Sequence, residues 1–359
     1  MPPPGWYAAP AARPRRRRGC WWLVLVPVTL LLGWLVLAVL VRLTDRPAPA
    51  PAPTDWSSPT VIPQSPALPL SRLAFDSDRG GNYELYTMGY DGADVTRLTR
   101  DPAYDSWSPR LSPDRRTILF HRTPAGVHDL DAAQTSLWAV GVDGTGLVQL
   151  RPVGTDGWVL QGHAEWSPDG RRLVMFGGSR INPQIHVTDA LGRQPKALTA
   201  RSGTNLDPVF SPDGTSIAFV GCPRAVCTEP NYEIYVMPAT GGDATRVTDD
   251  GMRDHDPMWS PDGRRLAWLT QISLGLPGTW DVRIAITSGR AVDASTATRL
   301  VGDNGITSRP EFTPDGSQIV VHRIPPGGTR FGIYRIPVAG GPLVEITQGH
   351  PGNNEYPSP

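Results

Sequence analysis

Residues 258–268 read MWSPDGRRLAW, and the middle of this stretch, an aromatic residue followed by Ser-Pro-Asp-Gly, recurs along the chain. It returns as EWSPDGRRLVM at 165–175 and as VFSPDGTSIAF at 209–219. Looser copies are RLSPDRRTILF at 110–120 and EFTPDGSQIVV at 311–321. The 359 residues therefore contain either a repeated active site or a repeated structural unit.

The Ser-Pro-Asp-Gly phrase has the residues of a type I turn. Serine offers a side-chain acceptor at the first position, proline fixes φ at the second, and glycine accepts a positive φ at the last. Arg115 replaces the glycine in the first copy, which predicts an adjusted or modestly strained turn there. The phrase is therefore predicted to connect two strands and not to carry catalytic residues.

A longer unit surrounds each turn. In the copy at 207–248, DPVFS precedes the turn, and SIAFVG, NYEIYVM and GGDATRVT follow it as three further strand-like runs. The run after each turn is apolar at consecutive positions, as in RRLAWLT at 264–270, which is typical of a sheet covered on both faces. Four short strands in each unit of about 50 residues are typical of a β-propeller blade.

The two ends of the repeat array complement each other. The runs 72–78, 82–88 and 94–99 form a unit without its first strand, and NNEYPSP at 353–359 resembles a first strand. Joining them completes a sixth blade and removes exposed sheet edges. We predict an all-β, six-bladed propeller of four-stranded blades over residues 71–359, closed by this C-terminal strand and preceded by a single transmembrane helix.

The units resemble the TolB-like, WD-repeat-like β-propeller repeat family. The repeats of that family read Pro-x-aromatic-Ser-Pro-Asp-Gly, an Ile-Ala-Phe-like strand, Asn-x-Glu-Ile-Tyr-Val-Met and Leu-Thr. The matching residues here are 208–214, 217–219, 231–237 and 247–248. The resemblance covers residues 71–359 and implies the fold. The TolB family also implies a periplasmic protein with an N-terminal domain and a lipoprotein partner. We expect a membrane helix and a stalk in place of that domain here, so the family's partner cannot be carried over to this chain.

Residues 21–41 are uncharged and mostly apolar. At about 1.5 Å per residue, a helix of this length spans roughly 30 Å, the thickness of the hydrocarbon layer of a bilayer. Five arginines lie within residues 1–20, and positive charge favours the cytoplasmic side. We expect a disordered basic cytoplasmic tail at 1–20, an uncleaved signal-anchor at 21–41 in the lipid bilayer of the cell membrane, and an extracytoplasmic propeller. A cleavable signal peptide is the alternative, although its apolar core is usually only about 7–15 residues long.

Residues 42–70 include RPAPAPAPTDW at 46–56, which favours extended polyproline conformations and predicts a stalk. Removing the seven arginines and one aspartate of residues 1–46 from the totals of 34 leaves 27 basic and 33 acidic side chains. This formal charge near −6 gives the body of the protein no electrostatic footprint for nucleic acid.

Cys222 and Cys227 flank a short segment of the predicted exported part. In an oxidising compartment a local disulfide is the favoured interpretation. Metal ligation is the alternative, but it would need more Cys or His in the segment, which has none.

Familiar catalytic motifs are missing from the sequence. It has no Gly-x-Ser-x-Gly elbow, no His-Glu-x-x-His motif and no phosphate-binding fingerprint, so we predict no catalytic residue, no metal motif and no cofactor. His121 and His322 occupy equivalent ends of second strands, where we expect partly buried, hydrogen-bonded side chains.

Polar residues stand just before each first strand, where this fold approaches the mouth of its central channel. They are Asp105, His163, Asp207, His255, Asp256, Arg309 and Asn354. These side chains could form a solvated rim, a small-ligand or metal site, or a peptide-binding rim. Two or three His and Asp side chains within about 5 Å of one point would favour a metal.

Three functions fit these features. The first is a membrane-anchored, non-enzymatic binding or scaffold module for a protein, a peptide or a cell-envelope glycan. The second is an enzyme at the channel mouth, a metal-assisted lyase or hydrolase acting on a glycan. The third is a ligand sensor that signals through the helix, although the tail is too short for an output domain.

Overall fold

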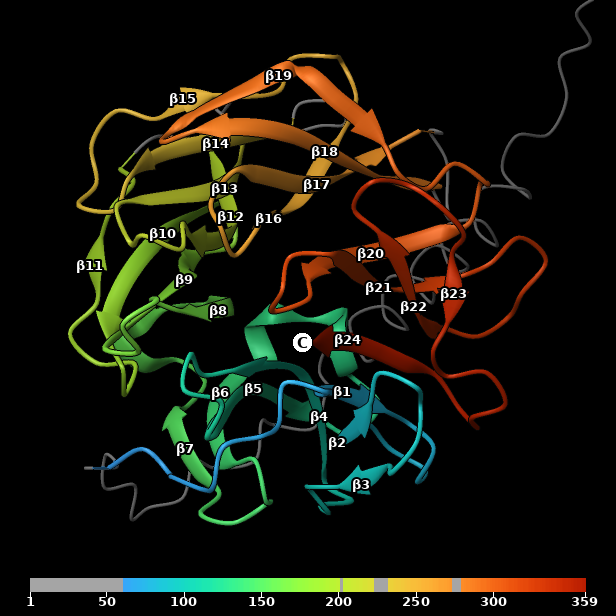
Figure 1. Ribbon diagram of the computed structural model, residues 1–359. Helices are drawn as coiled ribbons and strands as arrows, with labels where there is room; N and C mark the ends of the chain where they lie inside the picture. The colour runs from blue at the N-terminus through green and yellow to red at the C-terminus, as the bar shows by residue number, and fades with distance from the viewer. Residues whose placement is uncertain (1–60, 201–202, 223–231, 273–278) are drawn as a thin grey trace, which may run out of the picture. The chain divides into compact units, whose positions relative to one another are not determined.

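The computed structural model describes residues 61–200, 203–222, 232–272 and 279–359. Within these ranges, 24 strands form six four-stranded antiparallel sheets that follow one another around a ring (Figure 1). This confirms the prediction of an all-β, six-bladed propeller with four-stranded blades. We number the blades in chain order, and within each blade the first strand named is the innermost.

Blade 1 contains β24 (Asn354–Ser358), β1 (Arg72–Ser77), β2 (Glu84–Gly89) and β3 (Thr96–Arg97). Blade 2 contains β4 (Tyr104–Leu111), β5 (Thr117–Pro124), β6 (Ser136–Gly141) and β7 (Val148–Arg151). Blade 3 contains β8 (Leu160–Trp166), β9 (Arg172–Ser179), β10 (Asn182–Asp189) and β11 (Lys196–Ala197). Blade 4 contains β12 (Thr204–Phe210), β13 (Ser216–Cys222), β14 (Glu233–Pro238) and β15 (Thr245–Arg246). Blade 5 contains β16 (Asp254–Trp259), β17 (Arg265–Gln271), β18 (Trp280–Ser288) and β19 (Ala291–Arg299). Blade 6 contains β20 (Ile306–Phe312), β21 (Gln318–Ile324), β22 (Gly332–Pro337) and β23 (Val344–Glu345). The short 3₁₀ helices are η1 (His128–Leu130), η2 (Ala132–Gln134) and η3 (Thr155–Gly157).

The ring closes as predicted. β24 pairs antiparallel with β1, with Ser77 opposite Asn354 and Ala74 opposite Ser358. Both strands are buried along nearly their whole length. The C-terminal strand therefore completes blade 1 as its innermost strand and pairs with the edge that β1 would otherwise leave open.

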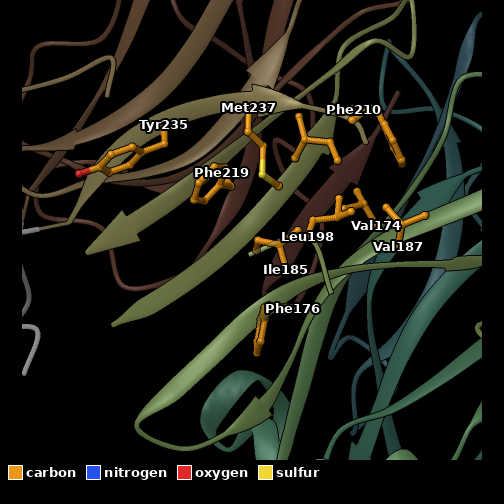
Figure 2. Packing of buried hydrophobic residues seen from close by; sticks show 11 residues of the cluster. Val174, Phe176, Ile185, Val187, Leu198, Phe210, Phe219, Tyr235 and Met237 are labelled. Atoms are coloured by element: carbon orange, nitrogen blue, oxygen red, sulfur yellow. The ribbon is translucent and has the colours of Figure 1, made fainter. Parts of the chain in front are cut away.

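The core is divided among the blade interfaces. Six clusters of buried apolar residues each draw on two neighbouring blades. Between blades 3 and 4, Val174 and Phe176 of β9 pack toward Phe219 of β13 and Met237 of β14 (Figure 2). Because every blade is covered on both faces, its second strand is apolar at consecutive positions, as the sequence indicates.

The recurring turns have the predicted construction. In the fourth blade, the Gly214 amide donates to the Ser211 carbonyl at 2.8 Å, and the Ser211 hydroxyl contacts Asp213 at 2.5 Å. Gly214 has a φ of +70°. Arg115 holds the equivalent backbone conformation at +57° although it has a side chain, so its turn is strained rather than rebuilt.

Hydrogen bonds offset this strain. The Arg115 guanidinium donates to the carbonyls of Leu68, Pro69 and Arg72, and its carbonyl accepts from the Leu68 amide at 2.7 Å. Arg115 thereby holds the segment at residues 68–72, where the chain enters blade 1, against blade 2.

The predicted boundary between stalk and propeller at residue 70 is too late. Leu68 is buried among apolar residues of blades 1 and 2, and Ser65 donates to Asp143 at 2.7 Å. Residues 61–70 thus lie on the propeller, because Leu68 and Ile62 have apolar surface to bury. The predicted tail (1–20), membrane helix (21–41) and first part of the stalk (42–60) lie outside the described residues. In the described ranges, no helix has the length and apolar character needed to cross a membrane.

Cys222 is buried at the end of β13 and is disulfide-bonded. Its predicted partner Cys227 lies outside the described residues, so the pairing stays a prediction. His322 is buried and accepts a hydrogen bond from the Tyr356 amide at 3.2 Å, as expected. His121 differs from the expectation because neither ring nitrogen has a hydrogen-bond partner within the described structure. Burial lowers the pKa of His121 well below its ordinary value, so this imidazole is neutral.

Candidate functional site

The six innermost strands share an irregularity at the centre of the propeller. Each pairs with its neighbour through a register shift, and one non-glycine residue at that shift has a φ between +45° and +52°. We call these six residues the central ring. They are Ser108, His163, Asp207, Asp256, Arg309 and Tyr356. Left-handed backbone is strained for residues with a side chain, and such strain concentrates at functional sites.

Proline explains where the strands are interrupted. A proline follows the central-ring residue in five blades, and Ala164 takes its place in blade 3. Proline has no amide hydrogen and cannot donate to the neighbouring strand, so pairing breaks at this position as a β-bulge. Bulges re-aim side chains, and here all six re-aimed side chains are polar.

His163, Asp207 and His255 form a chain of contacts across blades 3, 4 and 5. His163 Nδ1 lies 2.5 Å from Asp207 Oδ1, and His255 Nδ1 lies 3.0 Å from Asp207 Oδ2. Arg253 Nε donates to His255 Nε2 at 2.9 Å. Because an arginine only donates, His255 Nε2 is an acceptor, and its Nδ1 therefore carries the proton given to Asp207.

The histidines and carboxylates of this group stabilise each other's charged forms. Burial alone would lower the pKa of His163, but the carboxylates of Asp207 and Asp256 outweigh it and raise that pKa to about 9. Burial likewise opposes ionisation of Asp207, yet the two histidines hold its pKa well below the usual range. At neutral pH the pair is thus an imidazolium and a carboxylate.

Asp256 is the exception in the central ring. Each of the other five ring side chains has a hydrogen-bond or ion-pair partner, whereas no described residue pairs with the Asp256 carboxylate. Burial, followed by the nearby Asp207 charge, raises the pKa of Asp256 to about 6. It lines a small cavity with Asp207, Glu165 and Arg309, with room for about one water molecule or one ion.

Asp256 also lies close enough to its neighbours to share a cation with them. One ligand atom from each of His163, Asp207 and Asp256 lies within 4.8 Å of the others. One imidazole and two carboxylates are a donor set that suits divalent transition metals. A positively charged group from a partner could occupy the same position, because its charge would neutralise the unpaired Asp256 carboxylate.

A second layer of charge lies next to the central ring. Arg110 Nε and Arg309 Nη2 both contact Glu165 Oε1, the latter at 2.5 Å, and Arg110 Nη2 lies 3.2 Å from Glu311 Oε1. All four side chains are buried. Burial raises the pKa of both glutamates to about 7 despite the arginines.

A loop of blade 2 reaches across to the C-terminal strand. It carries η1 and η2, which Figure 1 shows as short teal turns near the centre of the ring, beside β24. The Tyr356 hydroxyl donates to Asp129, and the His128 ring stacks on Tyr83 with centroids 3.6 Å apart. Nε2 of His128 also lies 3.3 Å from Asp76 Oδ2. The loop therefore contacts one side of the central ring.

The predicted site residues fall into two groups. His163, Asp207, His255, Asp256 and Arg309 lie in or beside the central ring. We expected them just before the innermost strands, but they lie within these strands. The reason is that each strand continues on both sides of its bulge.

Asp105 and Asn354 lie three and two residues away from the ring positions of their blades. The Asp105 carboxylate accepts from the amides of Tyr83, Gly126 and His128, so it fastens the blade 2 loop. Asn354 accepts from Arg79. The positions equivalent to His163 in these two blades are Ser108 and Tyr356, and the sequence reasoning missed both.

Comparison with known proteins relates the propeller to TolB proteins. The model of the TolB β-propeller domain family matches residues 158–274. A TolB homolog from Chlorobium luteolum is 30% identical over 153 residues, or 42% of this chain and 31% of that protein. A TolB homolog from Chlorobium chlorochromatii is 28% identical over 155 residues, with the same coverage. The match spans about a third of the length of these curated relatives.

Solved structures agree with this fold. TolB from Acinetobacter baumannii superposes with a TM-score of 0.63 at 19% identity, covering 80% of this chain and 66% of that one. An oligogalacturonate lyase in complex with manganese gives a TM-score of 0.51 at 16% identity, covering 76% of this chain and 73% of that one. Identities this low show the fold alone.

Fold and site together define a β-propeller whose innermost strands build a polar ring at its centre. The matches to the TolB domain model over residues 158–274 and to the TolB homologs show more closely that this propeller is similar to those of the TolB type.

Proposed function

We propose that this protein is a non-enzymatic binding module that takes a protein or peptide partner at the centre of its propeller. The observation that carries the proposal is Asp256, a carboxylate in the central ring with no partner among the described residues and a small cavity in front of it. A lysine, arginine or amino terminus of a partner would pair with it. The acidic balance of residues 47–359 favours the same kind of partner.

The relatives support a module of the TolB type. Both Chlorobium proteins are named TolB homologs. We further propose that residues 21–41 hold the protein in the cell membrane, with the propeller outside the cytoplasm, so that it binds a partner of the cell envelope. An envelope glycan is the alternative ligand within this proposal.

A metal-assisted enzyme is a second candidate function. It rests on the convergence of His163, Asp207 and Asp256 within 4.8 Å, which meets the distance criterion for a metal. The oligogalacturonate lyase of similar fold is described as a complex with manganese. Against this candidate, His163 and Asp207 already neutralise each other, and the cavity is much smaller than a sugar ring.

Affinity capture with the full-length chain tests the proposal. Wild type, Asp256→Asn and Asp262→Asn would each be used to retain envelope material, which is then identified by mass spectrometry. Asp262 is a matched control because it lies in an exposed turn at the other end of the same strand. We expect wild type and Asp262→Asn to retain an intact partner and Asp256→Asn to lose it.

Two results would contradict the proposal. Equal retention by Asp256→Asn would show that the central carboxylate is not the docking group. Release of a cleaved product, stimulated by manganese and lost in both His163→Gln and Asp256→Asn, would favour the enzyme instead.

A further inference from the structure

Three blade interfaces are built alike on the side where each outermost strand connects to the next blade. At each of them an acid at the beginning of the third strand pairs with an arginine of the outermost strand. The pairs are Glu84 with Arg97, Glu233 with Arg246, and Asp281 with Arg299. An aspartate of the following loop comes next in all three repeats, as Asp101, Asp250 and Asp303.

Two of these interfaces contain a second cation. Between blades 1 and 2, Arg122 of β5 reaches Asp101 at 3.2 Å and donates to the Ser106 hydroxyl at 3.1 Å. Between blades 5 and 6, Arg323 of β21 contacts Asp303. Both arginines are about 2% exposed, so each places a guanidinium inside the interface to balance the acids.

The interface between blades 4 and 5 lacks this second cation and has one more acid. Thr270 stands where Arg122 and Arg323 stand, and Asp254 stands where the neutral Ser106 and Thr307 stand. Ligand oxygens of Glu233, Asp250 and Asp254 lie within 4.8 Å of one another. We call these three residues the rim cluster. Among the described residues, Arg246 alone forms an ion pair with it.

One carboxylate oxygen of Asp254 has no partner within the described structure. The residue is fully buried, and its Oδ1 accepts from the Thr270 hydroxyl at 2.6 Å, so the unpaired oxygen is Oδ2. A buried, unpaired carboxylate oxygen beside two further acids is costly unless a cation balances it.

The donors favour one class of cation. All three ligand groups are carboxylates, which hard cations prefer to softer metals. Oxygens that share a calcium ion each lie about 2.3–2.6 Å from it and hence at most roughly 5 Å apart, and the three ligand oxygens here lie within 4.8 Å of one another. We propose that Glu233, Asp250 and Asp254 bind Ca²⁺ at the position that an internal arginine occupies at the equivalent interfaces.

Calcium titration of the full-length chain, purified in detergent and treated with EGTA, tests this proposal. We expect calorimetry to give one site with a Kd of about 0.1–1 mM, the range of extracellular calcium modules. Calcium at about 5 mM should then raise the Tm by about 2–6 °C. Asp254→Asn and the exposed Asp250→Asn should each weaken binding at least about tenfold, a loss that matches one removed charged ligand.

A second test replaces the residues of this interface with their counterparts from another blade. Asp254→Ser with Thr270→Arg rebuilds the Ser106 and Arg122 pair of blade 2 at this interface. This variant should keep a cooperative melt and lose its response to calcium, while Asp262→Asn should respond as wild type. The proposal is overturned if wild type neither binds calcium nor changes its Tm, or if Asp254→Asn and Asp250→Asn both bind it as wild type does. Asp256→Asn leaves the cluster intact, so this test is independent of partner binding.

Discussion

Replacing His163 with glutamine removes the charged partner of the buried Asp207, and we expect it to lower the free energy of unfolding by about 3 kcal/mol at pH 7. The pKa of His163 is about 9 instead of the ordinary 6.5. A difference of this size corresponds to roughly 3 kcal/mol. Breaking a buried pair from one side typically costs about 3–5 kcal/mol. The lower end applies here because His255 still donates to Asp207.

The loss should depend on pH in a defined direction. The pKa of His163 is higher in the folded chain than in the unfolded one, so its contribution is complete below pH 6.5 and disappears as the pH rises through about 9. The difference between wild type and His163→Gln should therefore shrink between pH 7 and pH 10. A penalty that stays constant over this range would refute the assignment of an imidazolium to His163.

Urea unfolding of residues Ser57–Pro359, which form a compact unit, measures these values. A double-mutant cycle with Asp207→Asn should give a coupling energy of about 2 kcal/mol at pH 7, because the two residues contact each other directly. His186→Gln is the matched control. Burial lowers the pKa of His186, so it is neutral throughout this pH range and its substitution should show no such dependence. Coupling below about 0.5 kcal/mol would contradict an energetically significant ion pair.

Three further predictions follow from the described contacts. Arg115→Ala should lower the free energy of unfolding by about 1–3 kcal/mol, because three carbonyls lose a donor while the strained backbone remains. Arg115→Gly should lower it by about 1 kcal/mol less, because glycine accepts a φ of +57°. Urea unfolding that gave the reverse order would contradict this prediction. Deleting 354–359 should abolish the cooperative thermal transition seen by circular dichroism, and deleting Pro359 alone should not, because β24 closes the ring. Glu165→Gln should cost about 2–4 kcal/mol, since Arg110 and Arg309 then share only Glu311, and adding Arg309→Met should restore part of that loss in the same unfolding assay.

The fold could be predicted because its determinants are local and repeated. A turn such as 260–263 specifies its own backbone, and the apolar run at 266–269 after it specifies a strand covered on both faces. Five copies of this information set the number of blades, and the two incomplete ends set the closure. The start of the propeller is harder to predict, because Ile62 and Leu68 lie among prolines in a stretch that has no strand-like apolar run.

The central site could be predicted only in part, because its register depends on a bulge. A bulge adds one residue to a strand, so counting back from the turn does not show which side chain is re-aimed. The chemistry of His163, Asp207 and Asp256 indicates a site. In two other blades the sequence suggests Asp105 and Asn354 instead of the ring residues Ser108 and Tyr356. A better signal was present: in five blades the ring residue is the one directly before a proline.

The strand β16 deviates most from the other repeats. Its sequence begins Asp254, His255, Asp256, and burial together with neighbouring carboxylates raises the pKa of both aspartates. The corresponding positions in the other blades hold neutral or paired groups, such as Ser106 or Arg309. The same backbone can therefore be built without these unpaired charges. We therefore infer that a cation from outside the chain balances each of these two carboxylates, calcium at Asp254 and a partner's charged group at Asp256.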